Sequence, residues 1–494
     1  MVRYQIFYVS LLVKFKAKSM MNGKKILMAL AVSALAFTGT AVTPDWQDQV
    51  DELIAQGEFA RAEKVMKSLP KQVRRADAVR IDSLRTIMQR IRSDFRITPE
   101  EGVQRIREKM PQATDAQIEN WKRTRALEVM NIDGKEMWFR KSVGNLWLLG
   151  KEFAAQNAAD NHESFLTRRK YYLEAMRTPA DKNNVRDWRR VNITFTLDVN
   201  ADAVPAGETL RVWMPFPYEN LRQKNIRLES SNRPVTYSEG SLHHTVYMEA
   251  VAEKGKPTHF EYTFSYDVGE RHYSQQDLIA MLEPYNTNSE VYKRYTGNEP
   301  RHVIITDEMR ALARKIVGDE TNPVLQAAKI YEWIGYNLPW AGAREYSTLA
   351  NIPQYVIENH HGDCGQVGLL YITLVRSLGI PARWESGWML HPDEINWHDW
   401  CETYFEGIGW ISTDPSFGRS AVGTVMNDYY ATGIDVYRMA TNEGVGDKLS
   451  PAKTYIRSET VDFQPGEVEW RKGNLFYDKW DSHLKVNEIR AISY

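Results

Sequence analysis

Residues 362–388, GDCGQVGLLYITLVRSLGIPARWESGW, carry the strongest structural signal in the chain. From Val367 onward, apolar residues recur at the three- and four-residue spacing of an amphipathic helix. Gly379 and Pro381 end this helix, because glycine tolerates the left-handed conformation at a helix C-terminus and proline cannot continue the helix. The segment therefore predicts a helix that opens on a glycine-flanked turn at Cys364 and is followed by a strand.

Cys364 is one of only two cysteines in 494 residues, and it stands where the turn becomes the helix. Unpaired N–H groups and the helix dipole favour negative charge at that end, which is typical of a reactive thiolate. The same turn exposes backbone N–H groups that could hold the oxyanion of an acyl-transfer reaction. Position and local chemistry therefore favour a nucleophile at Cys364.

Three other roles for Cys364 remain open from the sequence. Free cysteines are often simply buried, although the polar and small neighbours of this one form no apolar stripe. Two His-x-x-Cys patterns offer four zinc ligands, namely His361, Cys364, His398 and Cys401. The second pattern lies in an alternating stretch, however, so its two members are expected on opposite faces of a strand. A disulfide between the two cysteines is permitted in an exported protein, but a chain of this size does not depend on one.

A nucleophilic thiol needs a base, and the base needs a partner that orients it. His398 is the best placed of the histidines, at the head of the alternating stretch HDWCETYFE. The two histidines just before Cys364 are too close to it in sequence, and His391 precedes a proline in an expected loop. The next strand, GWISTD, ends in Asp414, and antiparallel pairing would place Asp414 near His398. A carboxylate there holds the imidazole tautomer and stabilises its cation.

Together these motifs resemble the core of the transglutaminase-like superfamily. The resemblance covers about residues 323–418 and includes Gly-x-Cys at a helix start, Leu-Gly-Ile-Pro-Ala-Arg at its end, a histidine strand and Gly-Trp-x-x-x-Asp-Pro. It implies a papain-like α+β core in which Cys364 is the nucleophile, His398 the general base and Asp414 the orienting acid.

Two positions bear on how closely the family pattern applies. The residue after the histidine is often alanine in this family, whereas Asp399 stands here, followed by the usual Trp400. A side-chain oxyanion donor, often a Trp or Tyr well ahead of the cysteine, has two candidates, Trp340 and Tyr346. Buried aromatic packing accounts equally well for either residue, so the sequence leaves this donor undecided.

The resemblance also implies the chemistry. Enzymes of this kind attack a carboxamide or peptide carbonyl and form a thioester, which water hydrolyses or an amine transamidates. By analogy with exported bacterial members, we expect a cysteine peptidase or amidase. The alternatives are a protein-glutamine transamidase, which would cross-link, and a catalytically idle protein- or glycan-binding module on the same fold. No EF-hand loop is present in the sequence, and we expect no cofactor and no metal.

The N-terminus has the layout of a secretory signal. A lysine pair precedes the apolar run ILMALAVSALAF, residues 26–37, and residues 39–41 offer a small-x-small cleavage site. We expect an over-long start before Met20, a periplasmic or secreted enzyme, and no stable membrane span after signal removal. The net charge of −1 gives no basic field for nucleic acid. The expected partner is a protein or peptide substrate, with cell-wall peptide as one option.

The remaining patterns predict the order of domains in a chain with ordinary globular composition. Capping motifs at Thr98 and Thr114 indicate helices, a hairpin turn is expected at Asp133-Gly134, and a period of two after Trp188 predicts antiparallel sheet. The expected fold class is α+β, with a Cys helix packed on an antiparallel sheet, preceded by a β-sandwich-like domain and a helical region. The expected parts are a signal peptide at 1–41, a mostly helical domain at 42–187, a β-sandwich-like domain at 188–270, the catalytic core at 271–440 and a C-terminal β-like extension at 441–494.

Overall fold

The computed structural model describes residues 46–70, 74–149, 169–170, 172–173, 180–181, 183–299, 302–417 and 425–493. It divides into two units, Met1–Lys71 and Gln72–Tyr494, which are described separately. The expected signal peptide at 1–41 lies outside the described residues. Within those ranges, no helix has both the length and the apolar character needed to cross a membrane.

The described part of the first unit is a pair of helices, α3 (Trp46–Ala55) and α4 (Phe59–Ser68). Gly57 lies in the connection with a φ of 78°, a conformation that glycine adopts without a Cβ clash. Each helix buries one apolar stripe, as the helical spacing predicts. The buried side chains are Val50, Leu53, Ile54, Phe59, Ala62 and Met66.

The second unit begins with a helical region that carries a small three-stranded sheet. Thr98 caps the second helix through the N–H of Glu101, and Thr114 forms a full capping box with the third. The hairpin turns at Asp133 and Gly134, both with positive φ, as expected. The elements are α5 (Arg75–Asp94), β1 (Phe95–Ile97), α6 (Pro99–Lys109), α7 (Asp115–Arg123), β2 (Val129–Ile132), β3 (Lys135–Phe139) and α8 (Ser142–Leu149).

Two five-stranded antiparallel sheets follow the helical region. One has the order β13-β9-β4-β17, with β6 also paired to β9, and the other has the order β16-β15-β5-β8-β7. Alternate residues of β4, such as Val191, Ile193 and Phe195, are buried, as the period of two predicts. The strands are β4 (Val185–Val199), β5 (Thr209–Pro215), β6 (Gln223–Ser231), β7 (Thr236–Tyr237), β8 (Thr245–Val251), β9 (Thr258–His272), β13 (Gly433–Ile434), β15 (Glu467–Trp470), β16 (Gly473–Leu475) and β17 (Trp480–Ala491).

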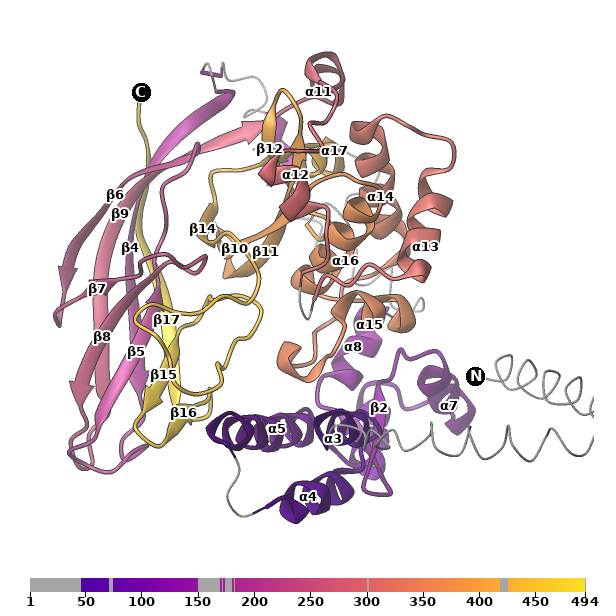
Figure 1. Cartoon of the computed structure of the whole chain (residues 1–494), viewed down its shortest axis with the longest axis vertical. Helices are drawn as coiled ribbons and strands as arrows, with labels where there is room; N and C mark the ends of the chain where they lie inside the picture. The colour runs from indigo at the N-terminus through magenta and orange to yellow at the C-terminus, as the bar shows by residue number, and fades with distance from the viewer. Residues whose placement is uncertain are drawn as a thin grey trace, which may run out of the picture. The chain divides into compact units, whose positions relative to one another are not determined.

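The C-terminal strands belong to these same two sheets. β17 pairs along its length with β4, and β15 pairs with β5. In Figure 1 the yellow C-terminal strands lie beside the magenta strands of the sandwich. The segment expected as a β-like extension thus supplies strands to both sheets.

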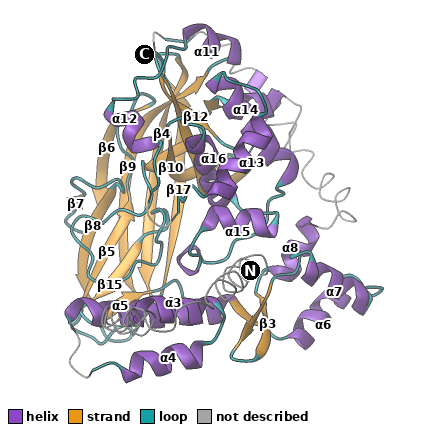
Figure 2. Cartoon of the chain, turned by 45° about the vertical axis from the view of Figure 1, so that its right-hand side comes forward, coloured by secondary structure: helices purple, strands orange, loops and turns teal. Residues whose placement is uncertain are grey.

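A four-stranded sheet of order β12-β11-β10-β14 and a layer of helices make up the region expected as the catalytic core. Figures 1 and 2 show the helices gathered on one side of this sheet. The strands are β10 (Ala382–His391), β11 (Glu394–Phe405), β12 (Gly409–Thr413) and β14 (Arg438–Asn442). The helices are α11 (Gln275–Met281), α12 (Glu290–Tyr295), α13 (Asp307–Val317), α14 (Pro323–Asn337), η2 (Tyr346–Thr348), α15 (Ile352–Asn359), α16 (Cys364–Ser377) and α17 (Val425–Ala431).

Helix α16 packs directly on β11. The thiol of Cys401 donates to the backbone oxygen of Gly368 at 3.4 Å, and the hydroxyls of Tyr371 and Thr403 are 2.8 Å apart. Most of α16 is buried, and its apolar side chains join those of α13, α14 and α15 in one core. This arrangement confirms the α+β class with a Cys helix on an antiparallel sheet.

Candidate active site

Helix α16 begins at Cys364 because Asp363 caps it. The Asp363 carboxylate accepts a hydrogen bond from the N–H of Gln366, and the Gln366 side chain accepts one from the N–H of Asp363. This capping box fixes the turn expected from the sequence. The N–H groups of Cys364 and Gly365 have no acceptor in the part of the chain that the structure describes, as expected for the first turn of a helix.

The thiol of Cys364 lies against Asp399 of β11. Its Sγ donates to Oδ2 of Asp399 at 3.3 Å. Gly365 makes this approach possible, because an added Cβ would lie 2.6 Å from the same oxygen and 2.4 Å from the hydroxyl of Tyr346. The side chain of Cys364 remains partly exposed, so a reagent or substrate can reach it.

The pKa of Cys364 is raised well above its usual value. Burial is the largest cause, followed by the negative charges of Asp399 and Asp363, while the backbone N–H of Asp399 acts in the opposite direction. The start of a helix is expected to lower a thiol pKa. Here burial and two neighbouring carboxyl groups outweigh that effect.

The structure brings His398 and Asp414 together, as the predicted strand pairing requires. In the antiparallel pair β11–β12, Cys401 lies opposite Thr413. Nε2 of His398 is 2.6 Å from Oδ2 of Asp414, and both side chains are buried. The pKa of His398 is lowered, first by burial and also by Arg438, while Asp414 opposes the shift. The imidazole is therefore held neutral, which is the state that accepts a proton.

Arg438 of β14 holds the same carboxylate, and no motif in the sequence points to it. Its guanidinium donates to Oδ2 of Asp414 at 2.7 Å and lies 4.5 Å from the ring centre of Phe417. The N–H groups of Ser416 and Phe417 bind the other carboxylate oxygen. Burial opposes the charge of Asp414, but His398 and Arg438 hold the pKa of Asp414 well below its usual range.

Cys364 does not contact His398. Its thiol contacts Asp399, the next residue of β11, while His398 contacts Asp414. Because side chains alternate along a strand, Asp399 and Cys401 face α16, whereas His398 faces Asp414 on the other side. The structure thus assembles the imidazole–carboxylate half of the predicted triad, and the thiol of α16 contacts Asp399, the residue after His398 on β11.

A second buried histidine–carboxylate pair lies near the first. The sequence places His391 in a loop, but it is the last residue of β10 and is buried. Its Nε2 is 3.4 Å from the carboxylate of Asp435, and its ring stacks on Phe417. The loop expectation for His391 is therefore wrong, because β10 continues through it to pair with Glu394 of β11.

The two candidate oxyanion donors both lie near the start of α16. The hydroxyl of Tyr346 donates to the carboxylate of Asp363. Trp340 forms an isolated parallel bridge with Gly362, and its side chain is 46% exposed. Tyr346 is therefore occupied by the helix cap, whereas the indole of Trp340 is open to solvent beside the turn.

Two residues of the segment between β14 and β15 complete the thiol side of the site, and no sequence signal points to them. The amide of Gln464 donates to Oδ1 of Asp399 at 2.7 Å and to the backbone oxygen of His398 at 3.0 Å. The carboxyl groups of Asp462 and Asp399 share a hydrogen bond. Burial raises the pKa of Asp399 to about 7 and raises the pKa of Asp462 well above its usual value.

The helical region braces the loop that leads to Tyr346. Arg90 of α5 lies 3.1 Å from a carboxylate oxygen of Glu345 and bonds the backbone oxygen of Ser458 at 3.1 Å. Asp94 accepts from the N–H of Glu345 at 2.7 Å. Since Tyr346 follows Glu345 and touches the cap of α16, α5 helps to fix the turn beside the thiol.

The geometry does not match a disulfide or a zinc site at Cys364. Both cysteines are free thiols, and the thiol of Cys401 points to Gly368 while His398 points to Asp414. The His-x-x-Cys residues therefore do not converge on a common point. No cluster of three or more potential metal ligands occurs among the residues that the structure places.

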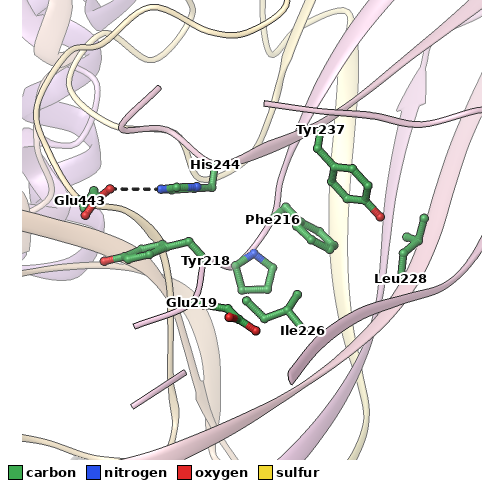
Figure 3. A pocket seen from close by; sticks show the side chains of 9 residues that line it. Phe216, Tyr218, Glu219, Ile226, Leu228, Tyr237, His244 and Glu443 are labelled. Atoms are coloured by element: carbon green, nitrogen blue, oxygen red, sulfur yellow. Dashed lines mark ion pairs between the residues drawn. The ribbon is translucent and has the colours of Figure 1, made fainter. Parts of the chain in front are cut away.

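A cavity of about 600 Å³ opens on the sandwich side of the molecule (Figure 3). It contains none of the predicted site residues. Tyr218 in its wall donates to Glu385, and the other oxygen of Glu385 accepts from the indole of Trp400, two residues after His398. The lining residues are Phe216, Pro217, Tyr218, Glu219, Ile226, Leu228, Tyr237, His244 and Glu443.

The sequence model of the Transglutaminase-like superfamily matches residues 310–415, so this part of the chain is a domain of that superfamily. The matched range includes Cys364, His398 and Asp414, together with the helix and strands that carry them. The family expected from the sequence motifs is thereby confirmed.

Three similar proteins illustrate the range of the likeness. The Bacillus subtilis (strain 168) protein YebA is 25% identical over 132 residues, which span 23% of this chain and 18% of the relative. A candidate cysteine protease from Cytophaga hutchinsonii aligns with a TM-score of 0.43 at 16% identity, covering 62% of this chain and 91% of that one. The periplasmic domain of TgpA from Pseudomonas aeruginosa aligns with a TM-score of 0.25 at 14% identity, covering 48% and 92%.

Proposed function

We propose that the protein is a thiol-dependent acyl-transfer enzyme that acts as a cysteine peptidase or amidase. Cys364 is the nucleophile, His398 the general base and Asp414 the residue that orients the imidazole. The observation that carries this proposal is the buried contact of 2.6 Å between Asp414 and His398 of β11. His398 is next in sequence to Asp399, the β11 residue that accepts a hydrogen bond from the thiol of Cys364. The superfamily match over residues 310–415 supports it.

The first half of the reaction moves one proton and exchanges one bond. His398 takes the proton of the Cys364 thiol. Because the structure places the two side chains on opposite faces of β11, this step requires a local rearrangement that brings them within hydrogen-bond distance. The thiolate attacks the substrate carbonyl carbon, and the first-turn N–H groups of Cys364 and Gly365 are the backbone donors nearest to the oxyanion. Collapse breaks the C–N bond, the amine leaves with the proton from His398, and a thioester remains on Cys364.

The second half decides the reaction class. Water, deprotonated by His398, attacks the thioester, releases the acid and restores the thiol. An amine in place of water would give transamidation by the same steps. Arg438 keeps the Asp414 carboxylate charged throughout. This carboxylate therefore stabilises the imidazolium of His398 each time that cation forms. The exposed indole of Trp340 is the side chain that we assign to the oxyanion in both halves.

We place the enzyme in the periplasm or outside the cell, on the basis of the signal-like N-terminus. Its substrates there are proteins or peptides, and peptides of the cell wall are the first class to test. The thioester chemistry requires only an accessible carboxamide or peptide carbonyl, so substrate choice rests on the surfaces around the thiol.

The test compares three proteins on one set of substrates. Wild type, Cys364→Ala and Cys401→Ala are each incubated with glutamine-containing peptides and cell-wall-type peptides, with and without a fluorescent primary amine. Cys401→Ala is the matched control, because it removes the other thiol, which is buried in the core and donates to a backbone oxygen of α16. We expect Cys364→Ala to lose all turnover and Cys401→Ala to retain it.

The products separate the candidate functions. Cleaved peptide or released ammonia supports a hydrolase, whereas incorporation of the fluorescent amine supports a transamidase. Turnover by Cys364→Ala equal to that of wild type would refute a thiol mechanism. No turnover by wild type on any of these peptides, with or without the amine, would favour a binding module.

A further inference from the structure

The group closest to the predicted nucleophile is a carboxyl that the function proposed above does not use. Oδ2 of Asp399 lies 3.3 Å from Sγ of Cys364, and its other oxygen is clamped by the amide of Gln464 at 2.7 Å. The carboxyl of Asp462 hydrogen-bonds the same group. Asp399 is 5% exposed and Asp462 is 2% exposed. The carboxyl is therefore held in one position against the thiol.

The groups that face Asp399 are acidic or neutral from every element packed on it. Asp363 and the thiol come from the start of α16, Asp462 and Glu459 come from the segment before β15, and the hydroxyl of Tyr346 comes from η2. Among the described residues, Asp399 forms no ion pair with a cation. The positive charge of Arg457 acts to lower the pKa of Asp462 and Glu459 instead, and in the described part of the chain neither of these residues hydrogen-bonds the thiol.

This setting differs from that of a carboxylate that supports a thiolate. Two negative charges 3.3 Å apart cannot both form without a large penalty when no cation lies between them. A protonated carboxyl in the same place donates a hydrogen bond to the sulfur and favours the thiolate. The protonation of Asp399 and the ionisation of Cys364 are therefore opposed.

We infer that Asp399 is a positioning residue that controls the Cys364 nucleophile: its ionised carboxylate keeps the thiol protonated, and its protonated carboxyl releases the thiol to ionise. The proton of the thiol still goes to His398, and the proton on Asp399 comes from solvent. This inference deepens the proposed function and rests on it, because it assigns a regulator to the same nucleophile.

The pH range of the effect follows from the burial of the carboxyl. The pKa of Asp399 is raised to about 7, chiefly by burial, so the residue changes charge near neutral pH. Below that pH the carboxyl is neutral and supports the thiolate; above it the carboxylate opposes the thiolate. Turnover by wild type should therefore decline as the pH rises through about 7.

The test measures the alkylation rate of Cys364 by iodoacetamide as a function of pH. The thiolate displaces iodide, so the rate reports the thiolate fraction directly. Mass spectrometry of the peptides that carry Cys364 and Cys401 follows both thiols in one full-length protein, and buried Cys401 serves as the internal reference. The variants are Asp399→Asn, Asp399→Ala and, as a matched control, Asp481→Asn, which removes an exposed carboxylate on β17.

We expect both Asp399 variants to move the alkylation midpoint of Cys364 at least about one pH unit lower, which is at least about a tenfold faster rate near neutral pH. Asp481→Asn should follow the wild-type curve. The wild-type curve should need two proton steps, because two groups titrate against each other. An Asp399→Asn curve that overlays wild type overturns the inference, and a slower rate in that variant would make Asp399 a base instead.

Three further outcomes separate failure of the inference from failure of the proposed function. If neither Asp399 variant folds, a wild-type alkylation curve with a single proton step still overturns it. If Cys364→Ala retains turnover, the proposed function fails while the alkylation result stands. If turnover depends on Cys364 but the alkylation curves coincide, only the role of Asp399 fails.

Discussion

The two sides of strand β11 treat a buried aspartate in opposite ways. On one side, Asp414 meets His398 and Arg438, and the charges balance within 2.7 Å. On the other side, Asp399 meets the carboxyl of Asp462, and no cation of the described residues pairs with it. Burial is nearly equal, at 1% and 5% exposure for Asp414 and Asp399. Their partners, and not their depth, set the direction of the two pKa shifts.

The difference shows how one strand can serve two tasks. Asp414 is permanently charged, which suits a residue that orients an imidazole and stabilises its cation. Asp399 changes charge near neutral pH, which suits a residue that controls a neighbouring thiol. Pairs of titratable groups whose surroundings push their pKa values apart are the usual mark of an acid–base site.

The largest expected effect comes from removing the charge on the balanced side. Asp414→Asn should lower turnover by about 10²–10⁴-fold, the range of a general acid–base contribution, because the imidazole loses its orienting anion. Steady-state kinetics on a peptide that wild type turns over measures this loss. The matched control is Asp198→Asn, which breaks an exposed His–Asp contact of 2.7 Å in the sandwich and should leave turnover unchanged. Equal losses in the two variants would remove the special role of Asp414.

A smaller effect is expected from crowding the thiol side. In Gly365→Ala the new Cβ would lie 2.6 Å from Oδ2 of Asp399 and 2.8 Å from the ring of Trp384. The strain should cost about 1–3 kcal/mol of unfolding free energy, measured by urea denaturation. Gly368→Ala, one turn later in α16, meets its nearest neighbour at 3.4 Å and should be neutral or stabilising. A Gly365→Ala protein as stable as Gly368→Ala would contradict the packing around the thiol.

The smallest effect is a change in stability with pH. The raised pKa of Asp399 means that the folded protein keeps a proton that the unfolded chain loses between about pH 4 and 7, so this residue's contribution is lost as the pH rises through about 7. Asp399→Asn has no carboxyl to titrate and does not lose this stability. The melting temperature of the variant relative to wild type should therefore rise by several degrees between about pH 5 and pH 8. The comparison cancels the buried histidines, such as His243 and His272, which titrate equally in both proteins.

Thermal unfolding followed by circular dichroism at several pH values checks this expectation. Asp481→Asn should stay parallel to wild type. If the gap between wild type and Asp399→Asn is constant across the range, Asp399 does not change its charge on the acid side of neutrality in the folded protein.

Local patterns were enough to predict the elements of the core. The two ends of α16 and the hairpin at Asp133-Gly134 depend on residues within a few positions of one another, and the pairing that joins His398 to Asp414 spans only 16 residues. These features follow from propensity and from the alternation of a strand. They place the imidazole and its carboxylate correctly without any knowledge of the rest of the fold.

The surroundings of the thiol could not be predicted in the same way. Arg438, Asp462 and Gln464 reach the site from strands and loops that follow it in the chain, and nothing in their local sequence marks them. Arg90 reaches the neighbouring loop from a helix 255 residues earlier. Asp399, at the position where the family often has alanine, is a small change in sequence, but in three dimensions it brings a carboxyl within 3.3 Å of the Cys364 thiol.

Acylation of the thiol by a small activated ester, such as p-nitrophenyl acetate, tests directly whether Cys364 is a nucleophile assisted by the His398–Asp414 pair. The acyl group is located by mass spectrometry of the quenched protein. We predict one acetyl group on the peptide that carries Cys364, none on the peptide that carries Cys401, and a much slower appearance of that group in Asp414→Asn. Acetylation of neither cysteine, or acetylation of Cys364 at the same rate in wild type and Asp414→Asn, would contradict a nucleophile served by the His398–Asp414 pair.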